Sequence, residues 1–172
     1  MVESVKSLKV DVLAFDGCFA AEMFGLVDLL NVANEVARAV QPLGPPPFRA
    51  TVVSVEGKQI TVAGGTMVRP ERASQNADLI VVPGFAFADP WTISVEGWEA
   101  EIRYLSSFRK KKTALASLCI GAFLLAEAGL LDGHRVTTSW LLAPELAKRY
   151  PLVNVQAGSL VVQDGRVLTS AS

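Results

Sequence analysis

The chain has 172 residues, which is enough for one domain with a substantial hydrophobic core. Its 16 basic and 17 acidic residues give a formal net charge of −1, so we expect no general attraction to nucleic acid or to an anionic membrane. One histidine and two cysteines, Cys18 and Cys119, exclude a disulfide framework and argue against a zinc site.

The N-terminal residues show no signal peptide, because 1–7 carry charges of both signs and lead directly into a strand pattern. No uninterrupted apolar run is long enough to span a membrane. We therefore expect a cytoplasmic protein in a reducing compartment.

Strand patterns alternate with helical patterns along the chain. Short apolar runs bounded by turn residues predict strands over 8–15, 48–55, 78–82, 113–118 and 136–139. One or two further short strands are expected within 60–68. Helical spacing of apolar residues predicts helices over 22–40, 95–109, 121–131 and 140–150. Three late strands are expected over 153–155, 160–162 and 167–169, with a hairpin turn at Asp164-Gly165.

This alternation predicts an α/β domain with a mostly parallel sheet. Ligands of such sheets bind beyond the carboxyl ends of the strands, and four loops should converge there: 16–22, 83–87, 119–121 and 139–140. The last residues read as the end of a strand. We therefore expect a single domain over 1–172 that lacks the final helix usual in a doubly wound sheet, as in a fragment of a longer protein.

Cys119 lies in the sequence Ala-Ser-Leu-Cys-Ile-Gly-Ala, where a short strand pattern turns into a helical one. A helix N-terminus beside a thiol should lower its pKa and make the thiolate available. The pattern is the cysteine counterpart of the serine nucleophile elbow. The alternative is a buried structural cysteine, which is common in cores. The strand-turn-helix context favours a functional site.

Four segments carry a family resemblance over nearly the whole chain: VLAFDGCFAAEMFGLVDLL, DLIVVPGF, SLCIGAFLLAEAGLLDGHRVTTSW and VVQDGRVLTSAS. They resemble the ThiJ/PfpI family of class I glutamine-amidotransferase-like proteins. The third segment is most similar to the N-terminal domain of AraC-type transcriptional regulators, in which a helix-turn-helix domain follows. The resemblance implies a three-layer α/β/α sandwich with a flavodoxin-like sheet, no cofactor, a homodimer, and DNA binding only through a domain absent from this chain.

The same resemblance implies roles for individual residues. Cys119 matches the nucleophile of active members, and Glu22 matches the acid near its sulfur. The backbone N–H groups of Gly84 or Phe85, together with that of Ile120, would form an anion-binding hole. Glu22 can also be an ordinary carboxylate in the first turn of a helix.

The sequence differs from that of the enzymatic members at the position of their catalytic base. Ser139 stands where enzymatic members often carry a histidine, and the only histidine, His134, lies in a turn that we expect at the other end of the following strand. Ile120 stands where isonitrile hydratases have a threonine, and its side chain donates no hydrogen bond. Cysteine activation by histidine is therefore not expected.

Aromatic side chains in the converging loops, Phe85, Phe87, Trp91 and Trp140, can line an apolar ligand pocket, pack the loops or form a subunit contact. Cys18 is expected to be a partly buried free thiol on the same sheet edge.

Our leading hypothesis is a non-catalytic, small-molecule-sensing domain of an AraC-type regulator. Cys119 and Glu22 would lie at the centre of its site, and the ligand would contact Gly84, Phe85, Ile120, Ser139 and Trp140. The alternatives are a cysteine hydrolase or isonitrile hydratase-like enzyme that uses Cys119, and a redox-sensing thiol.

Overall fold

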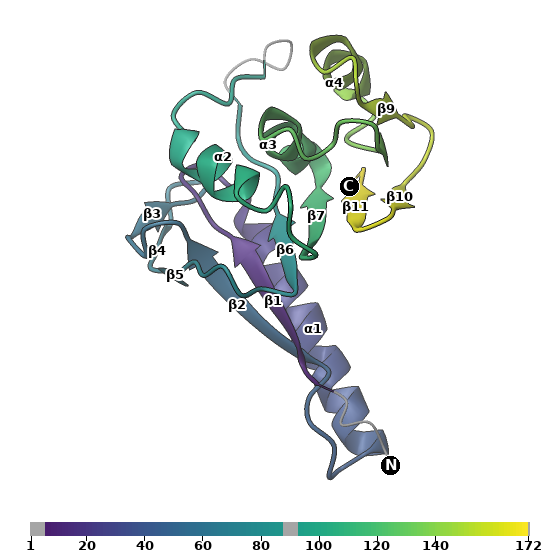
Figure 1. Cartoon of the computed structure of the whole chain (residues 1–172). Helices are drawn as coiled ribbons and strands as arrows, with labels where there is room; N and C mark the ends of the chain where they lie inside the picture. Colours follow the sequence, from purple (N-terminus) through teal and green to yellow (C-terminus); the bar gives the residue numbers. More distant parts are fainter. Residues whose placement is uncertain (1–5, 88–92, 172) are drawn as a thin grey trace.

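The computed structural model describes residues 6–87 and 93–171, and a seven-stranded sheet runs through its centre (Figure 1). The strand order is β10-β11-β7-β6-β1-β2-β5. These strands are β1 (Leu8–Leu13), β2 (Phe48–Ser54), β5 (Glu71–Arg72), β6 (Leu79–Val82), β7 (Ala114–Leu118), β10 (Val161–Asp164) and β11 (Val167–Ser170). All neighbours pair in parallel except β10 with β11, so the predicted mostly parallel sheet is confirmed.

Helices cover both faces of this sheet, as the three-layer prediction requires. In Figure 1, α1 (Ala20–Val40) lies behind the strands, whereas α2 (Glu99–Ser106) and α3 (Ala122–Glu127) lie in front of them. The fourth helix, α4 (Ala143–Arg149), has Pro144 in its first turn. It packs beside a small parallel sheet of β8 (Arg135–Val136) and β9 (Asn154–Val155), and β3 (Ile60–Thr61) pairs with β4 (Met67–Val68) as an antiparallel ribbon.

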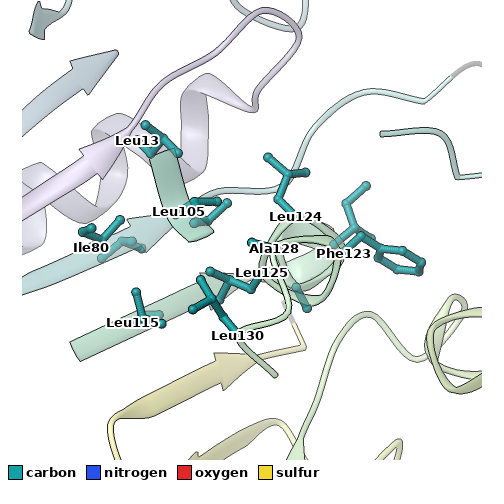
Figure 2. Packing of buried hydrophobic residues seen from close by; sticks show 14 of the residues in the cluster. Leu13, Ile80, Leu105, Leu115, Phe123, Leu124, Leu125, Ala128 and Leu130 are labelled. Atoms are coloured by element: carbon teal, nitrogen blue, oxygen red, sulfur yellow. The ribbon is translucent and has the colours of Figure 1, made fainter. Parts of the chain in front are cut away.

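The core lies between the central strands and the helices in front of them. Figure 2 shows Leu105 of α2 and the α3 residues Leu124 and Leu125 beside Ile80 and Leu115 of the sheet. All five side chains have 0% exposure. Full burial of such a side chain contributes about 1.5–3 kcal/mol to folding, so this layer holds α3 and the turn before it against the sheet.

The helix after Cys119 is shorter than the predicted 121–131. A 3₁₀ turn occupies Cys119–Gly121, and α3 itself ends at Glu127. Gly129 has a φ of 65°, and the N–H groups of Gly129 and Leu130 donate to the carbonyl oxygens of Ala126 and Leu125. These paired bonds form a Schellman motif, which ends the helix at Gly129.

The predicted helix over 95–109 is also shorter, because α2 begins only at Glu99. Gly97 has a φ of 90°, which is incompatible with a helix, and its N–H donates to the Glu99 side chain. The late hairpin is confirmed: β10 and β11 are antiparallel, and Gly165 between them has a φ of 59°.

Asp11 is a buried acid in the middle of β1. The residue is 1% exposed, and neither carboxyl oxygen has a hydrogen-bond partner among the described residues. Burial raises the pKa of Asp11, while the nearby Lys9 and the Ser74 backbone lower it by less. The fold therefore favours the neutral acid form at this position.

Replacing Asp11 by valine should stabilise the protein. The substitution removes a buried polar group without a partner, and we expect a gain of about 1–3 kcal/mol in the free energy of unfolding. The pKa of Asp11 is higher in the folded state than in the unfolded state. Its contribution to the free energy of unfolding is therefore most favourable below the unfolded pKa, and it is progressively lost as the pH rises through the folded pKa. The gain should therefore grow between acidic and neutral pH.

Urea denaturation at several pH values measures this gain. Asp28→Val is the matched control, because Asp28 is exposed on α1, and it should change stability by less than about 0.5 kcal/mol. A destabilised Asp11→Val protein would show that the carboxyl has a partner in solution.

Candidate functional site

The carboxyl ends of β1, β6 and β7 meet at one edge of the sheet, because these three neighbours are parallel and in register. The loops that follow β1 and β6 are joined there by backbone hydrogen bonds. Phe19 N–H donates to the Gly84 carbonyl over 2.8 Å, and Ala86 N–H donates to the Gly17 carbonyl over 2.8 Å. The predicted convergence of these loops with Cys119 is therefore confirmed.

Cys119 lies in a sharp turn between β7 and α3. Its φ of 50° is the only positive value among the described non-glycine residues. Such a conformation is uncommon for a residue with a Cβ and persists only where surrounding contacts impose it. Gly121 provides one such contact: a Cβ built on it would lie 2.3 Å from the Val82 carbonyl oxygen and 2.7 Å from that of Pro83.

Thr138 provides a second contact, which sequence reasoning missed. Its hydroxyl donates to the carbonyl oxygen of Cys119 over 2.8 Å, and the residue has 0% exposure. The adjacent Thr137 donates its N–H to Thr169 Oγ1 and its hydroxyl to the Ser159 carbonyl. The threonine pair thus ties the Cys119 turn to β11 and to the loop before β10. In the sequence, two adjacent threonines after a short strand do not indicate a site, because only their burial in the structure distinguishes them from surface residues.

Glu22 reaches the site from the first turn of α1. Its Oε2 accepts a hydrogen bond from Gly84 N–H over 2.6 Å. A Cβ built on Gly84 would lie 3.2 Å from this oxygen and 3.3 Å from the Cys119 Cβ, so the three residues are in close proximity. The anion hole is predicted from the N–H of Gly84 or Phe85 together with that of Ile120. Of these donors, the Gly84 N–H is occupied by the Glu22 carboxylate.

The electrostatics favour a neutral thiol. Burial raises the pKa of Cys119, the Glu22 carboxylate raises it further, and the Ile120 N–H opposes both. Burial also raises the pKa of Glu22, against the effect of the Gly84 N–H. The predicted lowering of the thiol pKa by a helix N-terminus is wrong here. The helix that follows has only six residues, and the desolvation of the sulfur outweighs it.

The remaining predicted ligand contacts are more dispersed. The Phe85 ring has 0% exposure and packs on Trp98, 4.5 Å between ring centres, and on Phe15. The Ile120 side chain is in the core. Ser139 is half-buried, Trp140 is 74% exposed, and Trp91 lies outside the described residues.

His134 lies beside an acid of β10, and Cys18 is buried in the core. His134 Nδ1 lies 3.6 Å from Asp164 Oδ2 of β10, and three residues separate it from Thr138, a span of roughly 13 Å if extended. Cys18 has 0% exposure, and both thiols are free, as predicted.

A groove of about 540 Å³ opens beside Glu22, between α1 and the end of β7. Its lining is mostly apolar, with carboxylates from Glu22 and Asp28. The other lining residues are Ala21, Gly25, Leu26, Leu29, Val32 and Leu118. This groove, on the α1 side of the site, was not predicted, because the exposed apolar positions of α1 look like core positions in the sequence.

Residues 6–87 and 93–171 contain no cluster of three or more histidine, cysteine or acidic side chains arranged to hold a metal ion. Within the same residues, no helix is both long and apolar enough to cross a membrane.

The fold and this site define an α/β domain with a cysteine at the carboxyl edge of a parallel sheet. The chain belongs to the DJ-1/PfpI family, whose sequence pattern matches residues 8–172. It is 30% identical over 147 residues to a protein described as "Uncharacterized protein in cpoL 5'region" of Streptomyces lividans, covering 83% of this chain and 95% of that protein.

Other relatives include regulators and an enzyme. The chain is 23% identical over 157 residues to the HTH-type transcriptional regulator GbdR of Pseudomonas aeruginosa, covering 90% of this chain but only 41% of the regulator. It is 28% identical over 116 residues to isonitrile hydratase of Pseudomonas putida, covering 64% of this chain and 46% of the enzyme. The structure of an AraC family transcriptional regulator from Pseudomonas putida superposes with a TM-score of 0.74 at 22% identity, over 96% of this chain and 84% of that one.

The role of Gly121 can be tested with a matched pair of glycine substitutions. Gly121→Ala should destabilise the fold by about 1–3 kcal/mol, because the new methyl group meets two backbone carbonyls that cannot move independently. Gly25→Ala in α1 meets nothing within 4 Å and should stabilise by about 0.5–1 kcal/mol through helix propensity. Chemical denaturation measures both. Equal effects of the two substitutions would contradict the close approach at Gly121.

The influence of Glu22 on the thiol predicts a change in alkylation rate. In a Cys18→Ser background, Glu22→Gln removes a carboxylate that raises the pKa of Cys119, so iodoacetamide should react faster at neutral pH. The rate measured against pH should show its inflection at lower pH than in the parent protein. Glu35→Gln, an exposed position farther along α1, is the control and should leave the profile unchanged.

Proposed function

We propose that this chain is a non-catalytic, small-molecule-sensing domain of an AraC-type transcriptional regulator. The ligand would bind between Glu22, Cys119 and the groove beside α1. The HTH-type regulators among its relatives and the fold of the solved AraC family regulator support this proposal.

The observation that carries the proposal is the hydrogen bond from Gly84 N–H to Glu22 Oε2, 2.6 Å long. Cysteine acyl chemistry needs free backbone donors at the developing oxyanion and a base that takes the thiol proton. Here a protein carboxylate occupies the Gly84 donor, Ser139 replaces the base, and the thiol pKa is raised. These features disfavour turnover of a substrate by Cys119, but they do not prevent a ligand from binding beside it.

The groove supports binding of a compact organic molecule. Its volume of about 540 Å³ falls in the range of small-molecule sites, and apolar side chains form most of its lining. Glu22 and Asp28 supply the carboxylates of the groove, which suit an amine- or amide-bearing ligand. Ser139 and Trp140 would complete the far side of the site.

Self-association is part of the same proposal. The outward face of α1 exposes Leu29, Val32, Val36 and Val40, each at least 59% exposed, next to the groove. A ligand at Glu22 would shift the arrangement of two copies, or of a neighbouring domain, and so alter DNA binding by a domain outside these 172 residues. A regulator of this kind would act in the cytoplasm.

A thermal-shift panel of small amines and amides against the purified chain tests the proposal. We expect a saturable rise in melting temperature with some members, retained in Cys119→Ser and lost in Glu22→Gln, without release of ammonia from amides. Electrophoretic mobility shifts should show no sequence-specific DNA complex. A tight, specific complex between this chain and DNA would contradict the proposal.

The alternative function is a cysteine enzyme acting on small amides or isonitriles. The φ of 50° at Cys119 favours it, because a nucleophile in a sharp strand-to-helix turn is the elbow arrangement of hydrolases. Cys119 would add to the carbonyl carbon of an amide and expel the amine, with Glu22 transferring the thiol proton to the leaving nitrogen, and water would then hydrolyse the thioester. With an isonitrile, the thiol S–H would add across the terminal carbon to give a thioimidate, which water would hydrolyse to the formamide and free Cys119. Substrate turnover that Cys119→Ala abolishes would establish this function. Absence of Cys119-dependent turnover across the panel would reject it.

A further inference from the structure

A second cavity, of about 490 Å³, lies at the opposite edge of the sheet from Cys119. It opens where β1 and β2 begin and where the chain approaches β6. Its polar lining comes from Lys6, Ser7, Lys9, Arg49, Thr51, Asn76 and Asp78. The six residues of β1 place this edge roughly 20 Å from the carboxyl edge, so the two cavities are separate.

Hydrogen bonds hold the walls of this cavity in place. Lys9 and Asp78 are joined twice: Lys9 N–H donates to Asp78 Oδ2 over 2.9 Å, and Asp78 N–H donates to the Lys9 carbonyl over 3.0 Å. The Lys9 ammonium donates to Ser74 Oγ over 2.8 Å, and Tyr104 donates its hydroxyl to the Ser74 carbonyl. A cavity with fixed walls can bind a ligand without first being ordered.

Two cations lie side by side on one wall. Lys9 and Arg49 are direct partners in the parallel pairing of β1 with β2, so their side chains leave the same face of the sheet. Like charges directly opposite each other on neighbouring strands destabilise a sheet. Neither Arg49 nor Lys9 forms an ion pair among the described residues. The Lys9 ammonium donates a hydrogen bond to the neutral Ser74 hydroxyl, and the Asp11 carboxyl is its nearby acid.

The acidic side chains that line the cavity are too few to balance this positive charge. Asp78 is the only acid in the lining, and it accepts the Lys9 N–H and lies 3.9 Å from the Lys6 ammonium. Asp11 follows Lys9 on the same face of β1 and pairs with Thr51, but it is buried and does not line the cavity. The cavity therefore has three cations, Lys6, Lys9 and Arg49, against one carboxylate.

From this juxtaposition we propose that the cavity at the amino ends of β1 and β2 is a binding site for a small anion bearing a carboxylate or phosphate group. Its oxygens would bridge Lys9 and Arg49, with Lys6 at the mouth. Arginine offers paired N–H donors to either group, and Thr51 and Asn76 supply neutral hydrogen bonds. The proposal is independent of the function assigned to the Cys119 site.

Titration of the isotopically labelled chain, followed by amide NMR, tests this site. Inorganic phosphate and acetate are added in separate arms at constant ionic strength, with chloride as the balancing anion. We expect saturable shifts at Lys9, Thr51 and Asn76 in at least one arm, and none at Gly84 or Cys119. The arm that saturates identifies the preferred group.

Arg49→Gln should raise the dissociation constant about tenfold or more, as expected when one charged partner of the ligand is removed. Arg103→Gln, an exposed cation on α2, is the matched control and should leave it unchanged. The same anion should also raise the unfolding midpoint of the parent protein but not that of Arg49→Gln. Linear shifts in both arms, or equal effects of the two substitutions, would overturn the proposal.

Discussion

The close approach of Gly121 to the carbonyl oxygens of Val82 and Pro83 is the constraint on which the site depends. It brings the start of α3 against the end of β6, and Cys119 must then turn through a φ of 50° to connect β7 with that helix. The core beneath maintains this arrangement, because α3 buries every residue from Ala122 to Ala126 against its surroundings. Strain at one cysteine is thereby balanced by the packing of a whole helix.

A second constraint acts across the site. The first turn of α1 and the loop after β6 exchange hydrogen bonds, since Phe19 donates to the Gly84 carbonyl and Gly84 donates to Glu22. Glu22 is therefore fixed by backbone geometry on both sides. The same arrangement places beside Cys119 a backbone donor that is already satisfied, the Gly84 N–H, and the Glu22 carboxylate that accepts from it. This explains why a sharp turn at the edge of the sheet coexists here with a thiol that favours its protonated form.

Much of this architecture could be predicted from the sequence, because local patterns determine it. The alternation of strand and helix patterns predicts the parallel sheet, and Asp164-Gly165 predicts the late hairpin. The residues around Cys119 predict the position of the turn. Features that depend on tertiary contacts could not be predicted in this way. Thr138 reaches Cys119 only because β8 returns beside the turn, and the raised thiol pKa follows from burial that no local pattern encodes. Likewise, the adjacency of Lys9 and Arg49 depends on strand register.

The hydrogen bond between Glu22 and Gly84 also has a consequence for selectivity. Because Glu22 Oε2 already holds the Gly84 amide, the protein carries its own competitor for any anionic group that approaches Cys119. A carboxylate ligand would have to displace this oxygen and then lie beside a second negative charge. A neutral or cationic molecule could instead bind against the carboxylate and leave the hydrogen bond intact. At the proposed site, a residue from the first turn of α1 would therefore select ligands by charge, in addition to any selection by the shape of the groove.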